Sequence, residues 1–178
     1  MTDPVEVRRV RLHEWREVRD LRLEAVSDPA ASIAFLTTRE EELARDEAFW
    51  RQRAAGAALG DTSAQFVAIA DGHWVGTATV LLRERGARDH LGREVEAPRA
   101  DIVGVFLAAA HRGTGILPQL FESAAAWAAD HGVDALTLDV HVDNARAQAA
   151  YRTAGFVPTG VTFTSAIGPE LEMRRALP

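Results

Sequence analysis

The residues with the clearest potential for chemistry are residues 111–117, which read His-Arg-Gly-Thr-Gly-Ile-Leu. They follow an apolar run that is typical of a strand and precede a pattern that is typical of a helix. Glycines let the backbone turn sharply and approach a ligand, and the first turn of a helix offers free N–H groups and a positive dipole end. Arg112 adds a fixed positive charge that suits a phosphate group. The segment predicts a phosphate-binding turn, with a plain turn before a core helix as the alternative.

Other phosphate motifs fit these residues less well. A dinucleotide fingerprint needs a third glycine, whereas Gly113 and Gly115 form a single Gly-x-Gly. The sequence contains no lysine, which excludes a Walker-type phosphate loop and Schiff-base chemistry on a lysine.

A second group of residues lies further along the chain. Asn144, Ala147 and Tyr151 are spaced i, i+3, i+7, so they share one face of a predicted helix, and Gly155-Phe156 follow that helix. Tyr151 is the only tyrosine of the chain. A single tyrosine on a helix is usually a packing residue, so the spacing alone leaves its role open.

The elements that must position these residues alternate between strands and helices. Asp71-Gly72 between two apolar runs predicts a tight hairpin. The charged stretch 83–99 is expected to be an exposed loop with a solvated surface, and Glu40, Glu41 and Glu42 are expected to form a solvated helix start. The predicted strands are 5–12, 65–70, 74–82, 101–107, 136–142, 161–165 and 171–176, and the predicted helices are 13–26, 38–55, 115–129 and 144–154.

This order, β-α-α-β-β-β-α-β-α-β-β, predicts an α/β protein with a mixed sheet in one domain, residues 1–178. Of the 178 residues, 47% are hydrophobic and 26% are charged, which is close to the average of globular proteins. The sequence shows no repeat or linker.

Charge and cysteine content exclude several classes of function. Twenty basic against 26 acidic residues leave a net charge of −6, which argues against nucleic acid or an anionic membrane as a partner. Without cysteine, there is no disulfide, thiolate metal site or cysteine nucleophile. No convergent ligand spacing indicates a metal site. The first residues do not resemble a signal peptide and no apolar run is long enough to span a bilayer, so a cytoplasmic location is expected.

Taken together, the two groups of residues resemble the GCN5-related N-acetyltransferase (GNAT) superfamily. The central signature of that family, R/Q-x-x-G-x-G/A after a strand, aligns with residues 112–117, and its later signature aligns with Asn144, Tyr151 and Gly155-Phe156. Two positions depart from the pattern: Leu117 stands in place of glycine or alanine, and Ala109 stands in place of a proline. The resemblance covers essentially the whole chain and implies the acyl-CoA N-acyltransferase fold.

The resemblance implies that acetyl-CoA binds between strands 101–107 and 136–142. Backbone groups of Val105, Phe106 and Leu107 would pair with its pantetheine arm, and an N–H near Leu107 would hold the developing oxyanion. Asn144 would hydrogen-bond to acetyl-CoA from its helix. The pyrophosphate would lie on the N–H groups of the turn, namely those of Arg112, Gly113, Thr114, Gly115, Ile116 and Leu117.

The same resemblance suggests catalytic roles. Tyr151 is the expected general acid, because a phenol with a pKa of about 10 keeps its proton at neutral pH and can give it to the leaving thiolate. Asp101 is the expected general base, by analogy with a glutamate that some family members carry on this strand. Asp139 and His141, which share a face of the neighbouring strand, are the reserve candidates.

The expected reaction is acetyl transfer from acetyl-CoA to a primary amine by direct attack in a ternary complex. The acceptor is a small molecule or a protein N-terminus, and the sequence leaves this choice open. A non-catalytic acyl-CoA-binding or sensing module is the alternative function. A homodimer is possible, since many members of the family are dimers.

Overall fold

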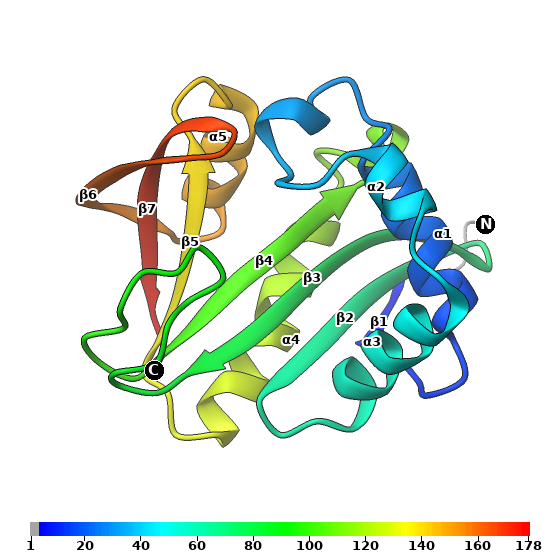
Figure 1. Ribbon diagram of the computed structural model, residues 1–178, viewed down its shortest axis with the longest axis horizontal. Coiled ribbons are helices and arrows are strands. Elements are labelled where there is room, and N and C mark those ends of the chain that lie inside the picture. The colour runs from blue at the N-terminus through cyan, green and yellow to red at the C-terminus, as the bar shows by residue number, and fades with distance from the viewer. Residues whose placement is uncertain (1–3) are drawn as a thin grey trace.

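The computed structural model describes residues 4–178 and is built on one seven-stranded mixed sheet (Figure 1). The strand order is β1-β2-β3-β4-β5-β7-β6, and β4 and β5 form the parallel pair in an otherwise antiparallel sheet. The strands are β1 (Glu6–Arg9), β2 (Ser63–Ala70), β3 (His73–Arg83), β4 (Arg99–Leu107), β5 (Ala135–His141), β6 (Val157–Ser165) and β7 (Gly168–Ala176). The predicted α/β fold with a mixed sheet is confirmed.

Helices cover both faces of the sheet, as Figure 1 shows for the two sides of β2–β4. One face packs against α4, and the other packs against α1 and α3. The α-helices are α1 (Trp15–Ala25), α2 (Arg39–Leu43), α3 (Glu47–Leu59), α4 (Ile116–Asp130) and α5 (Ala145–Thr153), and the 3-10 helices are Ala31–Ile33 and Ala109–His111. No helix among residues 4–178 is long and apolar enough to cross a membrane.

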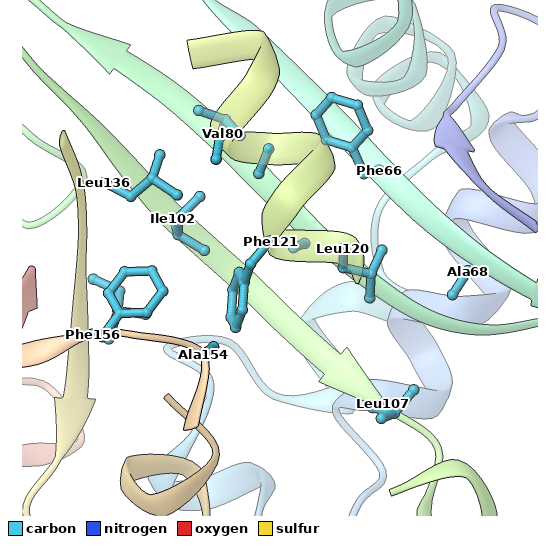
Figure 2. Packing of buried hydrophobic residues seen from close by; sticks show 14 of the residues in the cluster. Phe66, Ala68, Val80, Ile102, Leu107, Leu120, Phe121, Leu136, Ala154 and Phe156 are labelled. Atoms are coloured by element: carbon cyan, nitrogen blue, oxygen red, sulfur yellow. The ribbon is translucent and has the colours of Figure 1, made fainter. Parts of the chain in front are cut away.

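Alternation along the strands separates two layers of core. On β2, Phe66 and Ala68 face α4, while Val67 packs on the other side with Trp50 of α3. The larger layer is centred on Leu120 and Phe121 of α4, both fully buried (Figure 2). The Phe121 ring meets that of Phe156 edge to face at a centroid distance of 5.2 Å. This contact joins α4 to the segment between α5 and β6, and it supports the sheet on both sides of the β4–β5 pair.

The sheet opens between its two parallel strands. β4 and β5 pair only at Ala100–Leu136 and Asp101–Thr137, at the start of each strand. Beyond these pairs the strands diverge toward their carboxyl ends, as Figure 1 shows. The backbone edge of β4 that faces β5 from residue 102 onward therefore has no strand partner there.

Two expectations about the first half of the chain are wrong. The predicted helix 38–55 is two helices, because the Asp46 side chain accepts a hydrogen bond from Phe49 N–H and starts α3 anew. The α3 helix then continues past residue 55, the predicted end, to Leu59. Glu42 is not solvated but 1% exposed, and its carboxylate pairs with Arg22 at 2.9 Å and Arg45 at 3.2 Å.

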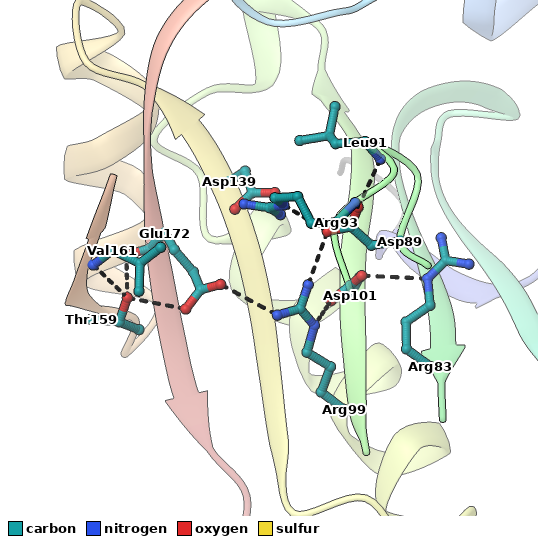
Figure 3. Close-up of polar contacts among 10 residues, drawn as sticks. All are labelled: Arg83, Asp89, Leu91, Arg93, Arg99, Asp101, Asp139, Thr159, Val161 and Glu172. Atoms are coloured by element: carbon teal, nitrogen blue, oxygen red, sulfur yellow. Dashed lines mark hydrogen bonds and ion pairs between the residues drawn. The ribbon is translucent and has the colours of Figure 1, made fainter. Parts of the chain in front are cut away.

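The stretch between β3 and β4 also differs from expectation. The stretch 83–99 was expected to be an exposed loop with a solvated surface. Between the strands, residues 84–98 do form a loop, yet Asp89 and Val95 within it are buried. Figure 3 shows the cause, a set of arginine–carboxylate pairs that fixes this loop, hereafter the β3–β4 loop, to β4 and β5. The hairpin prediction is confirmed, since Asp71 and Gly72 join β2 to β3 with φ of 48° and 76°.

Candidate active site

The opening between β4 and β5 forms a cavity of about 520 Å³, hereafter the β4–β5 cleft. β4 and β5 form its two sides, and the α4 start, α5 and the segment around Phe35 close its ends. A cleft where strands of a parallel pair diverge, beside a helix N-terminus, is a frequent ligand site in α/β proteins.

The predicted phosphate-binding turn borders this cleft. Gly113 and Gly115 have φ of 75° and 83°, the left-handed region that favours glycine, and Gly115 is the N-cap of α4. The Thr114 hydroxyl donates to His111 O at 2.5 Å and so fixes the turn from within. The N–H groups of the first turn of α4 are therefore free for a ligand, as the sequence suggested.

Arg112 has a structural task that the sequence did not indicate. Its Nε donates to Leu107 O at 2.9 Å, and its Nη2 pairs with Asp28 Oδ2 at 2.5 Å. Asp28 also lies 3.7 Å from Arg146 Nη2 on α5. Burial alone would raise the pKa of Asp28, but the Ala30 N–H and the two guanidiniums outweigh it and hold that pKa below its usual range. Asp28 thus connects its own segment to the turn before α4 and to α5, and it neutralises part of the Arg112 charge.

Helix α5 brings the second predicted group of residues into the cleft. Asn144 is the N-cap of α5, and its Oδ1 accepts a hydrogen bond from Ala147 N–H at 3.2 Å. Its Nδ2 takes no part in this cap. Tyr151 borders the cleft and packs its ring against Phe121 at 5.9 Å. Burial raises the pKa of Tyr151 to about 12, against a lowering effect of Arg146. The phenol is therefore fully protonated at neutral pH.

Asp101 does not border the cleft. It is 3% exposed at the closed end of the β4–β5 pair, with Oδ1 at 2.8 Å from Arg99 Nε and Oδ2 at 3.4 Å from Arg83 Nε (Figure 3). The guanidiniums of Arg99 and Arg83 lie against its carboxyl group, so its ion pairs are with the ends of β4 and β3. A base must lie beside the reacting atoms, and a position outside the cleft argues against the base role that the resemblance suggested for Asp101.

Asp139 does border the cleft, on the β5 side. Since Asp101 pairs with Thr137, Asp139 lies opposite Val103 across the widening gap. Its Oδ2 accepts from Arg93 Nη2 at 2.6 Å, while its buried Oδ1 makes no hydrogen bond to any residue in 4–178. Burial raises the pKa of Asp139 to about 6, and Glu170 and Glu172 add to this while Arg93 opposes it.

His141, the other reserve candidate, is buried at the far end of β5. Its Nδ1 accepts from Asp143 N–H at 3.0 Å, which places the proton of the neutral ring on Nε2. The imidazole then has no free lone pair to offer the cleft.

Most of the predicted site residues meet at this cleft, and others do not. Thr114 and Ile116 lie outside its lining, and Ile116 is packed in the core. Sequence analysis did not identify Asp28 and Arg93, because their contacts to the cleft are with Arg112 and Asp139, which lie far from them in the chain. The predicted residues that line the cleft are Val105, Phe106, Leu107, Arg112, Gly113, Gly115, Leu117, Asn144 and Tyr151.

A family model described as "Acetyltransferase (GNAT) family" matches residues 15–156, which include the turn, both sides of the cleft and α5. The chain belongs to the acetyltransferase (GNAT) family. Solved structures with the same fold include complexes with coenzyme A and with AcCoA, the acetyl donor and co-substrate of those proteins. The cleft fits that co-substrate, because the free edge of β4 can pair with an extended amide chain and the turn before α4 can hold phosphate.

Three relatives place this GNAT acetyltransferase among small proteins with the same fold. It is 32% identical over 90 residues to an aminoglycoside N(6')-acetyltransferase type 1 of Stenotrophomonas maltophilia, a match that covers 51% of this chain and 56% of that protein. The chain therefore spans little more than half the length of that relative. A nourseothricin acetyltransferase structure is 29% identical over 66% of each chain, with a TM-score of 0.53. A phosphinothricin acetyltransferase of Sinorhizobium meliloti in complex with AcCoA is 18% identical, covering 97% of this chain and 88% of that one, with a TM-score of 0.72.

Proposed function

We propose that the chain acetylates a primary amine of a small molecule, with Asp139 as general base and Tyr151 as general acid. The observation that carries this proposal is the free, buried Oδ1 of Asp139, which borders the same cleft as Tyr151. The names of the relatives, which act on aminoglycosides and phosphinothricin, support a small-molecule acceptor.

The β3–β4 loop also supports a small acceptor over a protein N-terminus. A peptide acceptor needs an open groove beside the cleft. Here Arg93 ties the loop to Asp139 of β5, and Val95 of the loop is fully buried. These contacts hold the loop against β4 and β5 beside Asp139, which lines the cleft (Figure 3).

The chemistry requires one proton to leave the amine and one to reach the sulfur. An alkylammonium has a pKa of about 10, so it must lose a proton before its nitrogen can attack the thioester carbonyl. With a pKa of about 6, Asp139 is largely ionised at neutral pH and its Oδ1 can accept that proton. The C–N bond then forms, the C–S bond breaks, and the electron pair stays on sulfur.

Tyr151 can donate to this sulfur. A transfer from a phenol of pKa about 12 to a thiolate of pKa about 8.5 is uphill by about 5 kcal/mol. This is well below the barrier of about 16 kcal/mol that a turnover of roughly 10 s⁻¹ implies. The phenol regains its proton from solvent, so the tyrosine is unchanged after each cycle.

The test is incubation of the purified protein with acetyl-CoA and a panel of small primary amines beside a set of short peptides with free N-termini. Thiol release together with a mass gain of one acetyl group on a small amine is the expected result. Acetylation of peptide N-termini alone would replace the small molecule with a protein acceptor.

A further inference from the structure

A second cavity lies on the sheet face opposite α4, between that face and α3. Its volume is about 430 Å³. We call it the Arg53 cavity, and its polar lining consists of Gln52 and Arg53 on α3 and Ser63, Gln65 and Thr79 on the sheet. Nothing in the acetyl-CoA chemistry described above uses these residues.

Strand register connects this cavity to the β4–β5 cleft. Gln65 pairs with Thr79, and Thr79 pairs with Val103, so the three form one row across the sheet. Val103 lines both cavities, and Asp139 lies on the opposite side of the cleft from it. A molecule in the Arg53 cavity thus lies next to the cleft on the side from which an amine would meet Asp139.

Within the described part of the chain, the Arg53 guanidinium contacts the ring of Trp50 at 5.7 Å from its centroid but has no anionic partner at ion-pair distance. It forms no ion pair or hydrogen bond there, and it is the only ionisable side chain that lines the cavity among residues 4–178. Glu42, the acid near it, is already paired with Arg22 and Arg45. Burial lowers the pKa of Arg53, and the charges of Arg22 and Arg45 act in the same direction while that of Glu42 opposes them. A half-buried cation without an ion-pair partner is costly, so an anion in this cavity would be stabilised.

We propose that the Arg53 cavity binds an anionic group of the acceptor, which makes the acceptor a primary amine that also carries a carboxylate or phosphoryl group. This inference rests on the proposed function. The planar guanidinium can bind either anion through two parallel hydrogen bonds, and Gln52 and Thr79 add neutral polar groups. One to two strand spacings separate the cleft from the cavity, so the amine and the anion are roughly 5–10 Å apart.

Acceptors that share a six-carbon amine chain and differ in the group at the end opposite the amine test this proposal. The set is 6-aminohexanoate, 6-aminohexyl phosphate, n-hexylamine and hexane-1,6-diamine, with glycine as a short amino acid. We expect kcat/KM for 6-aminohexanoate or 6-aminohexyl phosphate to exceed that for n-hexylamine at least tenfold, with the diamine and glycine poor. The ratio between the two anionic probes then distinguishes a carboxylate from a phosphoryl group.

Arg53→Gln should reduce the preference for the anionic probes over n-hexylamine to below about twofold, and Arg53→Lys should keep part of it. Arg51→Gln is the matched control, because Arg51 lies on the same helix and is exposed with its partner Glu47 at 2.6 Å. This control should keep the full preference. Equal rates with anionic and neutral probes, or a preference that persists in Arg53→Gln, would overturn the proposal.

A binding measurement separates this inference from the proposed function. Saturation-transfer NMR of 6-aminohexanoate with the protein and CoA should show a signal that Arg53→Gln loses and Arg51→Gln keeps. If no amine is acetylated but this binding pattern holds, the proposed function fails and the anion site stands. If amines are acetylated without anion preference and the NMR signal is the same in both variants, the anion site fails alone.

Discussion

At the residue scale, Tyr151 combines two properties in one side chain. Its ring packs against Phe121 and Phe156, and the residue, which carries a phenol, lines the β4–β5 cleft. Tyr151→Phe removes the hydroxyl and keeps the packing. We therefore expect turnover to fall well over tenfold, while the Kd for acetyl-CoA, measured by calorimetry, changes by only a few-fold. Unchanged turnover would remove Tyr151 from the mechanism.

Asp139 gives a prediction about pH. Its pKa of about 6 in the free protein should appear as a limb on the acid side of the kcat/KM profile, with activity falling as the carboxylate becomes protonated. Asp139→Asn should lose at least tenfold in kcat and lose this limb. Asp101→Asn tests the base that the sequence suggested, and its limb near pH 6 should remain. A limb that disappears in Asp101→Asn and persists in Asp139→Asn would reverse the assignment.

The same shift has a consequence for stability. The fold favours the protonated form of Asp139, so its contribution to the free energy of unfolding decreases as pH rises from about 4 to about 6. Between pH 5 and pH 7.5 this loss is about 1.4 kcal/mol. In urea unfolding, we compare the free energy of unfolding of Asp139→Asn with that of the parent. The value for the variant minus that for the parent should increase by about 1.4 kcal/mol from pH 5 to pH 7.5.

At the element scale, phosphate binding depends on the glycine turn before α4, because this turn orients the first N–H groups of the helix. An alanine at Gly115 would have to adopt φ of 83°, at a cost of about 1–2 kcal/mol, or the turn would rotate and move the first N–H groups of the helix. Gly132, just after the end of α4, has φ of 77° and lies outside the cleft. We expect Gly115→Ala and Gly132→Ala to lose similar stability in urea. Only Gly115→Ala should lose several-fold in affinity for acetyl-CoA, and equal affinities would argue against this turn as the phosphate site.

At the scale of the whole molecule, the diverging β4–β5 pair is a gap in the sheet that acetyl-CoA would bridge. A ligand that binds only the folded protein at a hundred times its Kd adds about 2.7 kcal/mol to the free energy of unfolding. For a chain of this length, Tm should rise by roughly 5–10 °C. Differential scanning calorimetry should show this rise with acetyl-CoA, and ATP or NAD at the same concentration should give a far smaller one.

The sequence by itself determined the features that depend on local spacing. Strand alternation, the Asp71-Gly72 hairpin, the glycine turn before α4 and the N-cap Asn144 are set by neighbours a few residues apart, and so is the resemblance to GNAT acetyltransferases. The break between α2 and α3 was also local, since Asp46 is a recognisable N-cap, but the charged run around it was interpreted as one helix start.

Tertiary structure alone decided which charged residues serve the site. Arg93 and Asp139 are 46 positions apart, and Asp28 and Arg112 are 84 apart, so no local pattern relates them. In the sequence, Asp101 and Asp139 look alike, because each is an acidic residue within an apolar strand. The fold places Asp101 beside two arginines at the closed end of the β4–β5 pair and places Asp139 in the lining of the cleft, where the strands diverge. The pKa of a carboxylate and its chemical role depend on its burial and on the partners that the fold brings near it. The spacing of residues in a sequence shows neither.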